Sequence, residues 1–231
     1  MADDQADQSR LNKYLSLHLG LSRRKSDELI EFGRVSINGV TAVLGARISD
    51  TDKVAVDGKI ISGETELIYL LLNKPIGYVC SRSSQGSKTV YELLPPEYHQ
   101  LNTVGRLDKD SSGLIMMTND GDFTFKMTHP KFSKTKLYEV RLDHDLEPLH
   151  QQMISDFGLD LEDGHSQFTL MSLSDDNRTD WQVTMTEGRN RQIRRSFASL
   201  GYTVKRLHRT NFGDYALGDI KRGEFEVVNI R

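Results

Sequence analysis

The sequence has a single cysteine, five prolines and no long hydrophobic run in its 231 residues. One cysteine, Cys80, excludes an internal disulfide and any zinc site built from several cysteines, and we expect it to be a small buried side chain. The longest apolar run, residues 67–72, is far shorter than the roughly 20 residues that a membrane span requires. The first eight residues are polar and acidic, unlike a secretory signal, so we expect a cytoplasmic protein with no membrane partner.

Net positive charge is also lacking, because the formal net charge is −3. Locally the balance differs: residues 186–209 carry seven Arg or Lys against one acid, whereas residues 141–185 carry ten acids against two arginines. A phosphate backbone responds to the field within about 8–10 Å, so the basic segment matters more than the total. Taken by itself, the basic segment 186–209 could instead be the solvent-exposed face of a helix with no phosphate partner. We expect the acidic stretch 141–180 to face away from any such phosphate backbone.

Helical and hairpin patterns predict a small unit near the N-terminus. Apolar spacing after Leu11 predicts a helix that ends at Gly20, and Ser22 is a suitable N-cap for a second helix. Asn-Gly at 38–39 and Asp-Gly at 57–58 predict two tight hairpins. These elements form one compact unit.

The predicted organisation is α+β, with a mainly antiparallel mixed sheet flanked by helices in the larger domain. We expect a disordered acidic tail at 1–8, the small domain at 9–62, a linker at 63–66 and the large domain at 67–231. Predicted strands of the large domain are 67–72, 114–118, 136–142, 181–186 and 202–207, and its predicted helices are 122–128 and 189–200.

The basic positions of the small domain, combined with its helix order and hairpin turn, carry a family resemblance. Residues 10–15 read RLNKYL, 22–25 read SRRK, 33–35 read GRV and 37–39 read ING. The unit resembles an S4 RNA-binding domain. Cations on the first turn of a helix add to its positive dipole end and suit phosphate. We expect RNA contacts from Arg23, Arg24, Lys25 and Arg34.

The most informative segment is residues 104–114, VGRLDKDSSGL, which alone could be a turn with a capping carboxylate. Downstream, KLY at 136–138 opens a strand and EGRNRQIRR at 187–195 enters a helix. With LNKPIGYV at 72–79 and RLHR at 206–209, these segments resemble the RsuA/RluB branch of the ribosomal RNA pseudouridine synthases.

This resemblance implies an isomerase that detaches uracil from ribose, turns it and rejoins it through carbon 5, without cofactor or metal. It implies Asp108 as the essential aspartate, Tyr138 as the active-site tyrosine and Arg194 as the basic residue facing the aspartate. An aspartate with an ordinary pKa of about 3.9 is ionised at neutral pH and could attack carbon or remove a sugar proton. The tyrosine ring could stack on uracil and remove the proton from carbon 5.

A uridine inside folded RNA must be flipped out to reach a carboxylate. We hypothesise that Arg106, two residues before Asp108, fills the vacated position. The other residues expected at the RNA are Arg189, Arg191, Arg195 and Arg209, and His208 could also touch it. Neutralising Arg191 and Arg195 should flatten the salt dependence of binding by about two phosphate contacts.

Two other functions remain open from the residues alone: an RNA chaperone or ribosome-assembly factor without activity, and a hydrolase using Asp108 and Asp110. The expected partner is ribosomal RNA or a pre-ribosomal particle, and a monomer suffices. Residues 190–195 and 213–214 look closer to the large-subunit enzymes of this branch, so we expect a uridine of large-subunit RNA as the target.

Overall fold

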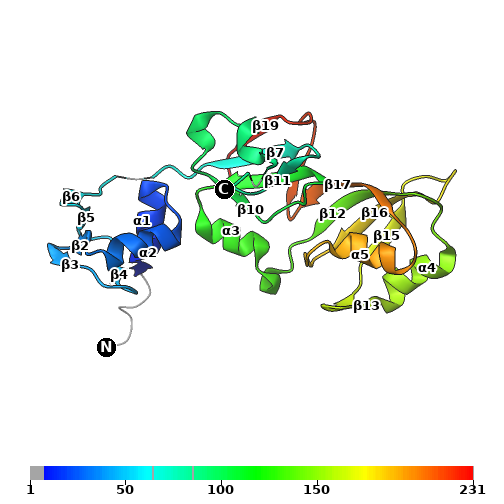
Figure 1. Ribbon diagram of the computed structural model, residues 1–231, viewed down its shortest axis with the longest axis horizontal. Helices are drawn as coiled ribbons and strands as arrows, with labels where there is room; N and C mark the ends of the chain where they lie inside the picture. Colours follow the sequence, from blue (N-terminus) through cyan, green and yellow to red (C-terminus); the bar gives the residue numbers. More distant parts are fainter. Residues whose placement is uncertain (1–7, 64, 85, 231) are drawn as a thin grey trace. The chain divides into compact units, whose positions relative to one another are not determined.

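The computed structural model describes residues 8–63, 65–84 and 86–230. By their contacts they divide into a first unit, residues up to Ile68 together with Asn119–Gly121, and a second unit, Tyr69–Thr118 with Asp122 onward (Figure 1). The acidic tail expected at 1–8 lies outside the described residues except for Gln8, as does residue 64 of the expected linker. Each unit has its own hydrophobic core.

The two helices of the first unit begin and end where the sequence pattern predicts. Helix α1 (Leu11–Leu19) is followed by Gly20 at φ +64°, a left-handed conformation that glycine adopts easily. Helix α2 (Arg23–Glu31) is capped by Ser22, whose side chain accepts a hydrogen bond from the backbone N–H of Lys25.

Six short strands accompany these helices: β1 (Ser9–Arg10), β2 (Val35–Ile37), β3 (Val40–Thr41), β4 (Arg47–Ile48), β5 (Val54–Val56) and β6 (Lys59–Ile60). Four form an antiparallel sheet in the order β3-β2-β5-β6, and β1 pairs with β4. The predicted hairpin turns are present, with positive φ at 38–39 and 57–58. The core consists of Leu11, Leu15, Ile30, Val35, Ala42, Ile48 and Val54.

A nine-stranded mixed sheet organises the second unit and confirms the predicted α+β class. Seven strands follow the order β15-β16-β12-β17-β11-β7-β19, while β10 pairs with β11 and β18 with β17. All pairs are antiparallel except β11 with β17. The strands are β7 (Tyr69–Lys74), β10 (Asn102–Val104), β11 (Ser112–Thr118), β12 (Lys136–Leu142), β15 (Thr169–Ser172), β16 (Asp180–Met185), β17 (Val204–Phe212), β18 (Tyr215–Ala216) and β19 (Phe225–Val228).

One glycine makes the central parallel pairing possible. Every residue of β11 is buried, and Gly113 lies opposite Arg209 of β17. At position 113 a Cβ would collide with the backbone of Arg209, and φ is +102°. Any side chain here would therefore push β17 away from β11.

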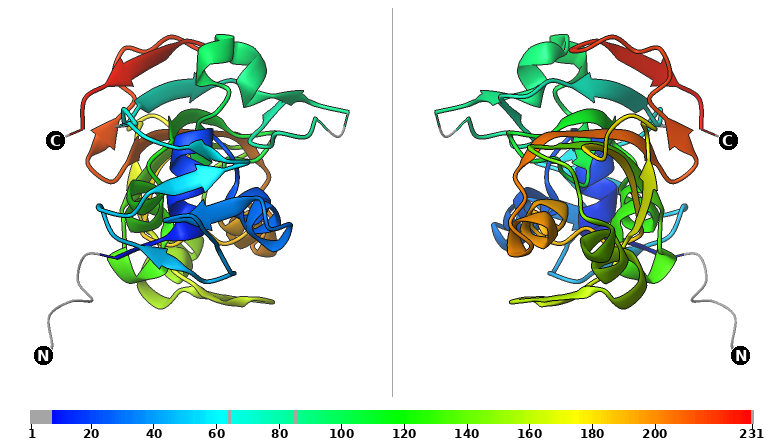
Figure 2. Two further views of the ribbon diagram at one scale, coloured as in Figure 1. Left: turned by 90° about the vertical axis from the view of Figure 1, so that its left-hand side faces the viewer. Right: turned by 90° about the vertical axis from the view of Figure 1, so that its right-hand side faces the viewer.

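Helices α3 (Gly121–Thr128), α4 (Pro148–Gln152) and α5 (Gln192–Ser199) accompany the sheet, and α5 contacts β17 and the hairpin β13 (Leu159–Leu161) to β14 (Gly164–Ser166) (Figures 1 and 2). The short elements are η1 (Val90–Leu93), η2 (Pro96–Tyr98), η3 (Pro130–Phe132), η4 (Met153–Phe157) and the pair β8 (Tyr78–Val79) with β9 (Lys88–Thr89). Within the described ranges, no helix has the length and apolar character to cross a membrane.

The predicted helix 189–200 is wrong at its start, because α5 begins only at Gln192. Arg191 takes a left-handed φ of +46°, and the Gln192 side chain accepts a hydrogen bond from the backbone N–H of Arg189. Residues 187–190 therefore form a loop before the helix. Arg189 lies in this loop and Arg191 directly before the helix, although the sequence pattern predicts both within the helix.

Candidate active site

Asp108 lies in the loop between β10 and β11, and this loop is tied to the segment that follows β7. The contacts are Lys74 Nζ to Ser111 O at 2.6 Å, the Gly77 N–H to Lys109 O at 2.7 Å, and the Leu107 N–H to Cys80 Sγ at 3.4 Å. Three contacts along a short loop restrict its backbone. The KPIGYVC stretch thus positions the residues around Asp108.

Lys74 is the least expected part of this arrangement, because its side chain is fully buried. Burial lowers the pKa of its ammonium to about 8, although the nearby Cys80, Asp108 and Asp110 oppose that shift. Carbonyl oxygens of Pro75 and Ser111 accept its hydrogen bonds. The Lys74 ammonium therefore places a buried positive charge near the carboxylates of this loop.

A cleft of about 860 Å³ opens beside Asp108. Asp108 and Tyr138 both line it, from the β10–β11 loop and from β12 respectively. The Asp108 side chain is 35% exposed, whereas Tyr138 is buried in the cleft wall. The cleft therefore joins an accessible carboxylate and a phenol ring, and its size suits a nucleoside.

Two guanidinium groups lie near the carboxylates of the Asp108 loop. Arg191 Nη1 lies 3.7 Å from Asp108 Oδ2, and Arg191 also donates two hydrogen bonds of 2.8 Å to Asp110. Arg194 contacts Asp110 instead, through Nε at 3.4 Å from the carboxylate and Nη2 at 2.8 Å from the carbonyl. The charge of Arg194 also interacts favourably with that of Asp108, so the role of Arg194 as the basic residue facing Asp108 remains a prediction.

The Asp110 carboxylate is paired with both Arg191 and Arg194. Its hydrogen bonds with Arg191 lower the pKa of its carboxyl, and the charge of Arg194 adds to that effect. It is absent from the residues that line the cleft, unlike Asp108. The structure therefore provides no opposed pair of carboxylates at Asp108 and Asp110, as a glycoside hydrolase of that kind would need.

Two further cations lie in the wall next to Tyr138. Lys136 donates to the carbonyls of Lys134, Thr186 and Glu187, and burial, followed by the charge of Arg209, lowers its pKa to about 8. Arg209 is buried and donates to Leu114 O. The Lys136 ammonium and the Arg209 guanidinium lie 5.3 and 4.8 Å from the Phe212 ring centroid. The wall is thus cationic beneath an apolar surface.

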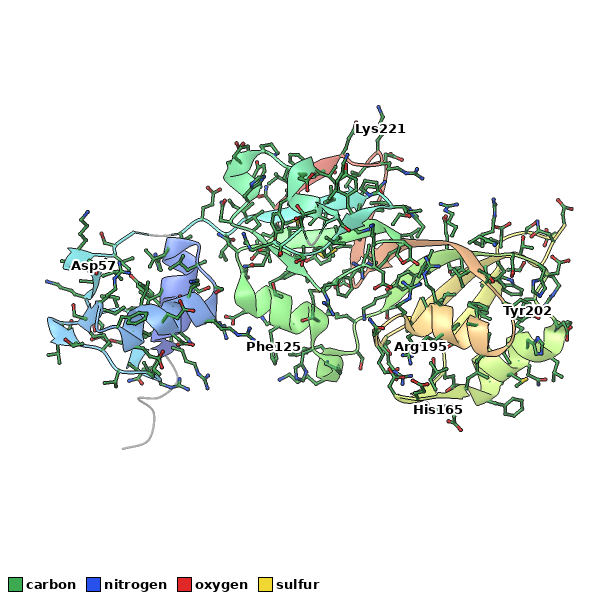
Figure 3. All side chains as sticks on the ribbon, viewed as in Figure 1. Asp57, Phe125, His165, Arg195, Tyr202 and Lys221 are labelled. Carbon is green, nitrogen blue, oxygen red and sulfur yellow. The ribbon has the colours of Figure 1, made fainter. Side chains whose placement is uncertain are left out.

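The acidic stretch does not face wholly away from the site, contrary to the prediction. Asp163, on the turn between β13 and β14, lines the cleft and pairs with Arg195 at 2.9 and 2.6 Å and with Arg189 at 2.9 Å. Its hydrogen bond with Arg195 lowers the pKa of the Asp163 carboxyl. Figure 3 shows Arg195 beside the hairpin that carries His165. The hairpin is therefore fastened to the arginines of α5.

The remaining predicted residues fall into three groups. Arg106 is exposed and lines the cleft beside Arg189, Arg191 and Arg209. His208 is half-buried, does not line the cleft, and has its Nδ1 2.9 Å from Ser112 Oγ. In the first unit all four cations predicted to contact RNA, Arg23, Arg24, Lys25 and Arg34, are exposed. Lys25 forms an ion pair with Glu28, and Arg34 forms one with Asp57.

Sequence reasoning missed Lys74, Lys136 and Asp163. The motif at 72–79 was noticed, but nothing in it reveals that a lysine after an apolar strand points inward. Lys136 was noticed only as the start of a strand. Among the residues that the structure describes, no cluster of three His, Cys, Asp or Glu side chains is arranged to hold a metal.

Comparison with known proteins is consistent with this geometry. The family model described as RNA pseudouridylate synthase matches residues 68–199, which include Asp108, Tyr138 and Arg194. A solved structure described as "Crystal structure of pseudouridylate synthase" is similar with a TM-score of 0.67 and 30% identity, covering 95% of this chain and 96% of the other.

Two curated relatives match almost end to end. "Ribosomal large subunit pseudouridine synthase B" of Bacillus subtilis (strain 168) is 35% identical over 222 residues, 93% of this chain and 90% of the relative. "Ribosomal small subunit pseudouridine synthase A" of Pasteurella multocida (strain Pm70) is 34% identical over 225 residues, 95% of this chain and 96% of the relative. The chain therefore belongs to the RNA pseudouridylate synthase family and is an RNA pseudouridine synthase, an intramolecular isomerase.

Proposed function

We propose that this enzyme isomerises a specific uridine of ribosomal RNA, with Asp108 performing the chemistry on a flipped-out nucleotide. The observation that carries this proposal is the accessible Asp108 carboxylate on a cleft shared with Tyr138, with Arg191 3.7 Å away. Substrate and product have the same composition, so the net reaction needs no oxidant, reductant or group donor. The cleft lies within one unit, and a monomer is sufficient.

Asp108 acts in its ionised form, either as a nucleophile at carbon 1′ of the ribose or as a base on a sugar proton. As a nucleophile, Asp108 forms an ester with carbon 1′ as the bond from carbon 1′ to N1 of uracil breaks, and carbon 5 then displaces the carboxylate. As a base, Asp108 takes the proton from carbon 2′ as that bond breaks, and it returns this proton when carbon 5 bonds to carbon 1′. The guanidinium of Arg191 and the buried ammonium of Lys74 place positive charge near this carboxylate. The fixed loop holds that charge in place without reorganisation.

Tyr138 holds the detached base and finishes the reaction. Its ring forms part of the cleft wall, so uracil can stack on it while turning. Once carbon 5 is bonded to the sugar, its proton must move to N1, and the Tyr138 hydroxyl can relay it by accepting this proton as it gives up its own. Arg194 serves as a positioning residue that fixes Asp110 and, through it, Arg191.

The substrate is ribosomal RNA, and we propose the large subunit as its source. Relatives named for each subunit are about equally similar, so support comes from residues 190–195 and 213–214, which resemble the large-subunit enzymes. The first unit, with its exposed basic helix α2, is the proposed S4-like RNA-binding domain. Comparing pseudouridines in ribosomal RNA from cells with and without the gene tests the assignment; loss of a small-subunit site alone would overturn it.

Release of tritium from RNA labelled at carbon 5 of uracil tests the reaction itself. We expect ribosomal RNA to release tritium with the wild-type enzyme and not with Asp108→Asn, which keeps the shape but removes the charge. Binding of the same RNA by both proteins is the control for folding. Equal release by the two proteins would remove Asp108 from the chemistry.

A further inference from the structure

Two exposed phenylalanine rings lie close in sequence to Thr128, His129 and Pro130, which line the cleft. Phe125 of α3 is 46% exposed and Phe132 of η3 is 38% exposed. Figure 3 shows Phe125 on the outer side of α3. Their ring centroids are 5.8 Å apart in an edge-to-face arrangement. The two rings therefore present a combined aromatic surface to solvent.

His129 joins this surface to the cleft. Its ring centroid lies 4.6 Å from that of Phe125 and 6.4 Å from that of Phe132. His129 itself lines the cleft, together with the neighbouring Pro130 and Ser133. The aromatic surface is thus continuous with the cavity that Asp108 and Tyr138 line.

The surroundings of the rings are basic. The Lys131 ammonium lies 5.1 Å from the Phe125 ring centroid and 4.7 Å from that of Phe132. Residues 123–136 contain four lysines and neither aspartate nor glutamate. In the described part of the chain no carboxylate lies within 4 Å of the Lys131 ammonium. Lys134 pairs with Asp214 at 3.7 Å, so Lys131 is the cation that these rings offer, and exposed aromatics beside such a lysine match a polyanion that carries flat bases.

We propose that Phe125, His129 and Phe132, with Lys131, form a stacking platform for an unpaired base of the RNA strand next to the target uridine. The inference rests on the proposed function and adds a subsite to it. A flipped uridine leaves its neighbours partly unstacked, and an aromatic platform beside the cleft replaces the lost stacking. Lys131 contacts the adjoining phosphate. Because every base has a flat face, the platform contributes affinity with little sequence preference.

The test measures binding of a 12-nucleotide single-stranded RNA of uridines containing one 2-aminopurine, whose fluorescence is quenched on stacking. The Phe125→Ala/Phe132→Ala double variant should bind about tenfold more weakly, with reduced quenching. Phe157→Ala is the matched control, because Phe157 is 66% exposed in the same unit and does not line the cleft. Phe125→Trp should keep the quenching that Phe125→Ala loses, since it returns an aromatic face.

Turnover separates this subsite from the reaction. On ribosomal RNA labelled with tritium, the double variant should raise KM about tenfold and leave kcat within about twofold. An alternative outcome is that the double variant binds the RNA and quenches its fluorescence as well as the wild type does, while the wild-type enzyme still releases tritium. That result would overturn the platform and leave the proposed function intact. No tritium release by the wild type would instead overturn the proposed function. Self-association of the wild type, lost in the double variant, would assign the surface to a second copy and also overturn the proposal.

Discussion

Basic side chains in two regions of the molecule are held in different ways. On α2 of the first unit, Arg23 and Arg24 are exposed at the surface. Beside the cleft of the second unit, Arg191 pairs with Asp110 and Arg195 with Asp163. The first set can meet phosphate directly, whereas the second must exchange a carboxylate for a phosphate.

Arginine has two different roles in this protein, positioning of neighbouring groups and attraction of phosphate, and a count of charges does not distinguish them. A paired arginine contributes a fixed direction to its neighbours, as Arg194 does when it binds Asp110 O and Val204 O. An exposed arginine contributes long-range attraction that salt weakens. We therefore expect substitutions of arginines that fix carboxylates near the cleft to change turnover, and substitutions of exposed arginines on α2 to change binding.

Arg194→Ala should have the largest effect. Its side chain is only 12% exposed and bridges the Asp108 loop to β17, so its loss leaves buried carbonyls unpaired and frees Asp110. We expect turnover to fall about 100-fold or more and stability to fall by about 3 kcal/mol. Tritium release and urea unfolding measure these effects. Arg194→Lys keeps the charge but not the fork of donors, and activity close to wild type in either variant would contradict a positioning role.

Arg106→Ala should have the next largest effect, and only on structured RNA. Arg106 is exposed at the cleft, and within the described residues it has no ion pair like those of Arg189 and Arg191, so it is available to fill the position of a flipped uridine. We expect turnover on folded ribosomal RNA to fall at least about tenfold more than turnover on an unpaired oligonucleotide. Equal losses on the two RNAs would refute this role.

The salt dependence of RNA binding tests the comparison itself. Arg23→Gln/Arg24→Gln should reduce the slope of log affinity against log salt by nearly two, roughly 0.7–0.9 for each phosphate contact. Arg191→Gln/Arg195→Gln, which we first expected to remove two contacts, should reduce it by less than about one, because both cations are already paired. A larger reduction in slope for Arg191→Gln/Arg195→Gln than for Arg23→Gln/Arg24→Gln would contradict the distinction between paired and exposed arginines.

Lys136→Met should produce the smallest effect, a change in how the free energy of unfolding depends on pH. The folded-state pKa of Lys136, about 8, is below the ordinary 10.5, so the folded protein binds fewer protons between these values and becomes more stable as pH rises through them. Below about pH 8 the full cost of the buried charge is present. Relative to Lys136→Met, wild type should gain about 2 kcal/mol from pH 7.5 to 10, allowing for partial solvation. Urea unfolding at several pH values measures this, and a constant difference would contradict it.

The helices and hairpins of the first unit could be predicted because their signals are local. Ser22 caps a helix, Gly20 ends one, and Asn38-Gly39 turns a hairpin whatever else surrounds them. The start of α5 could not be predicted in this way. Arg191 adopts a left-handed conformation that its residue type does not favour, and its bonds to Asp110, far away in sequence, accompany it.

The site shows the same division between local and distant information. The motif around Asp108 identifies the loop, but its partner depends on where α5 begins, and the resemblance named Arg194 where Arg191 lies closer. Asp163 was treated as part of an acidic stretch, and only the fold of the β13–β14 hairpin brings it to Arg189 and Arg195. Net charge along a sequence cannot reveal such pairings.

The central claim is that Asp108 carries the chemistry and that Asp110, two residues away, only holds arginines. Tritium release by Asp108→Asn and Asp110→Asn, measured on one ribosomal RNA at equal enzyme saturation, tests it most directly. The account predicts a loss of at least about 1,000-fold for Asp108→Asn and a residual rate at least about tenfold higher for Asp110→Asn. Retained activity in Asp108→Asn, or a greater loss in Asp110→Asn, would contradict it.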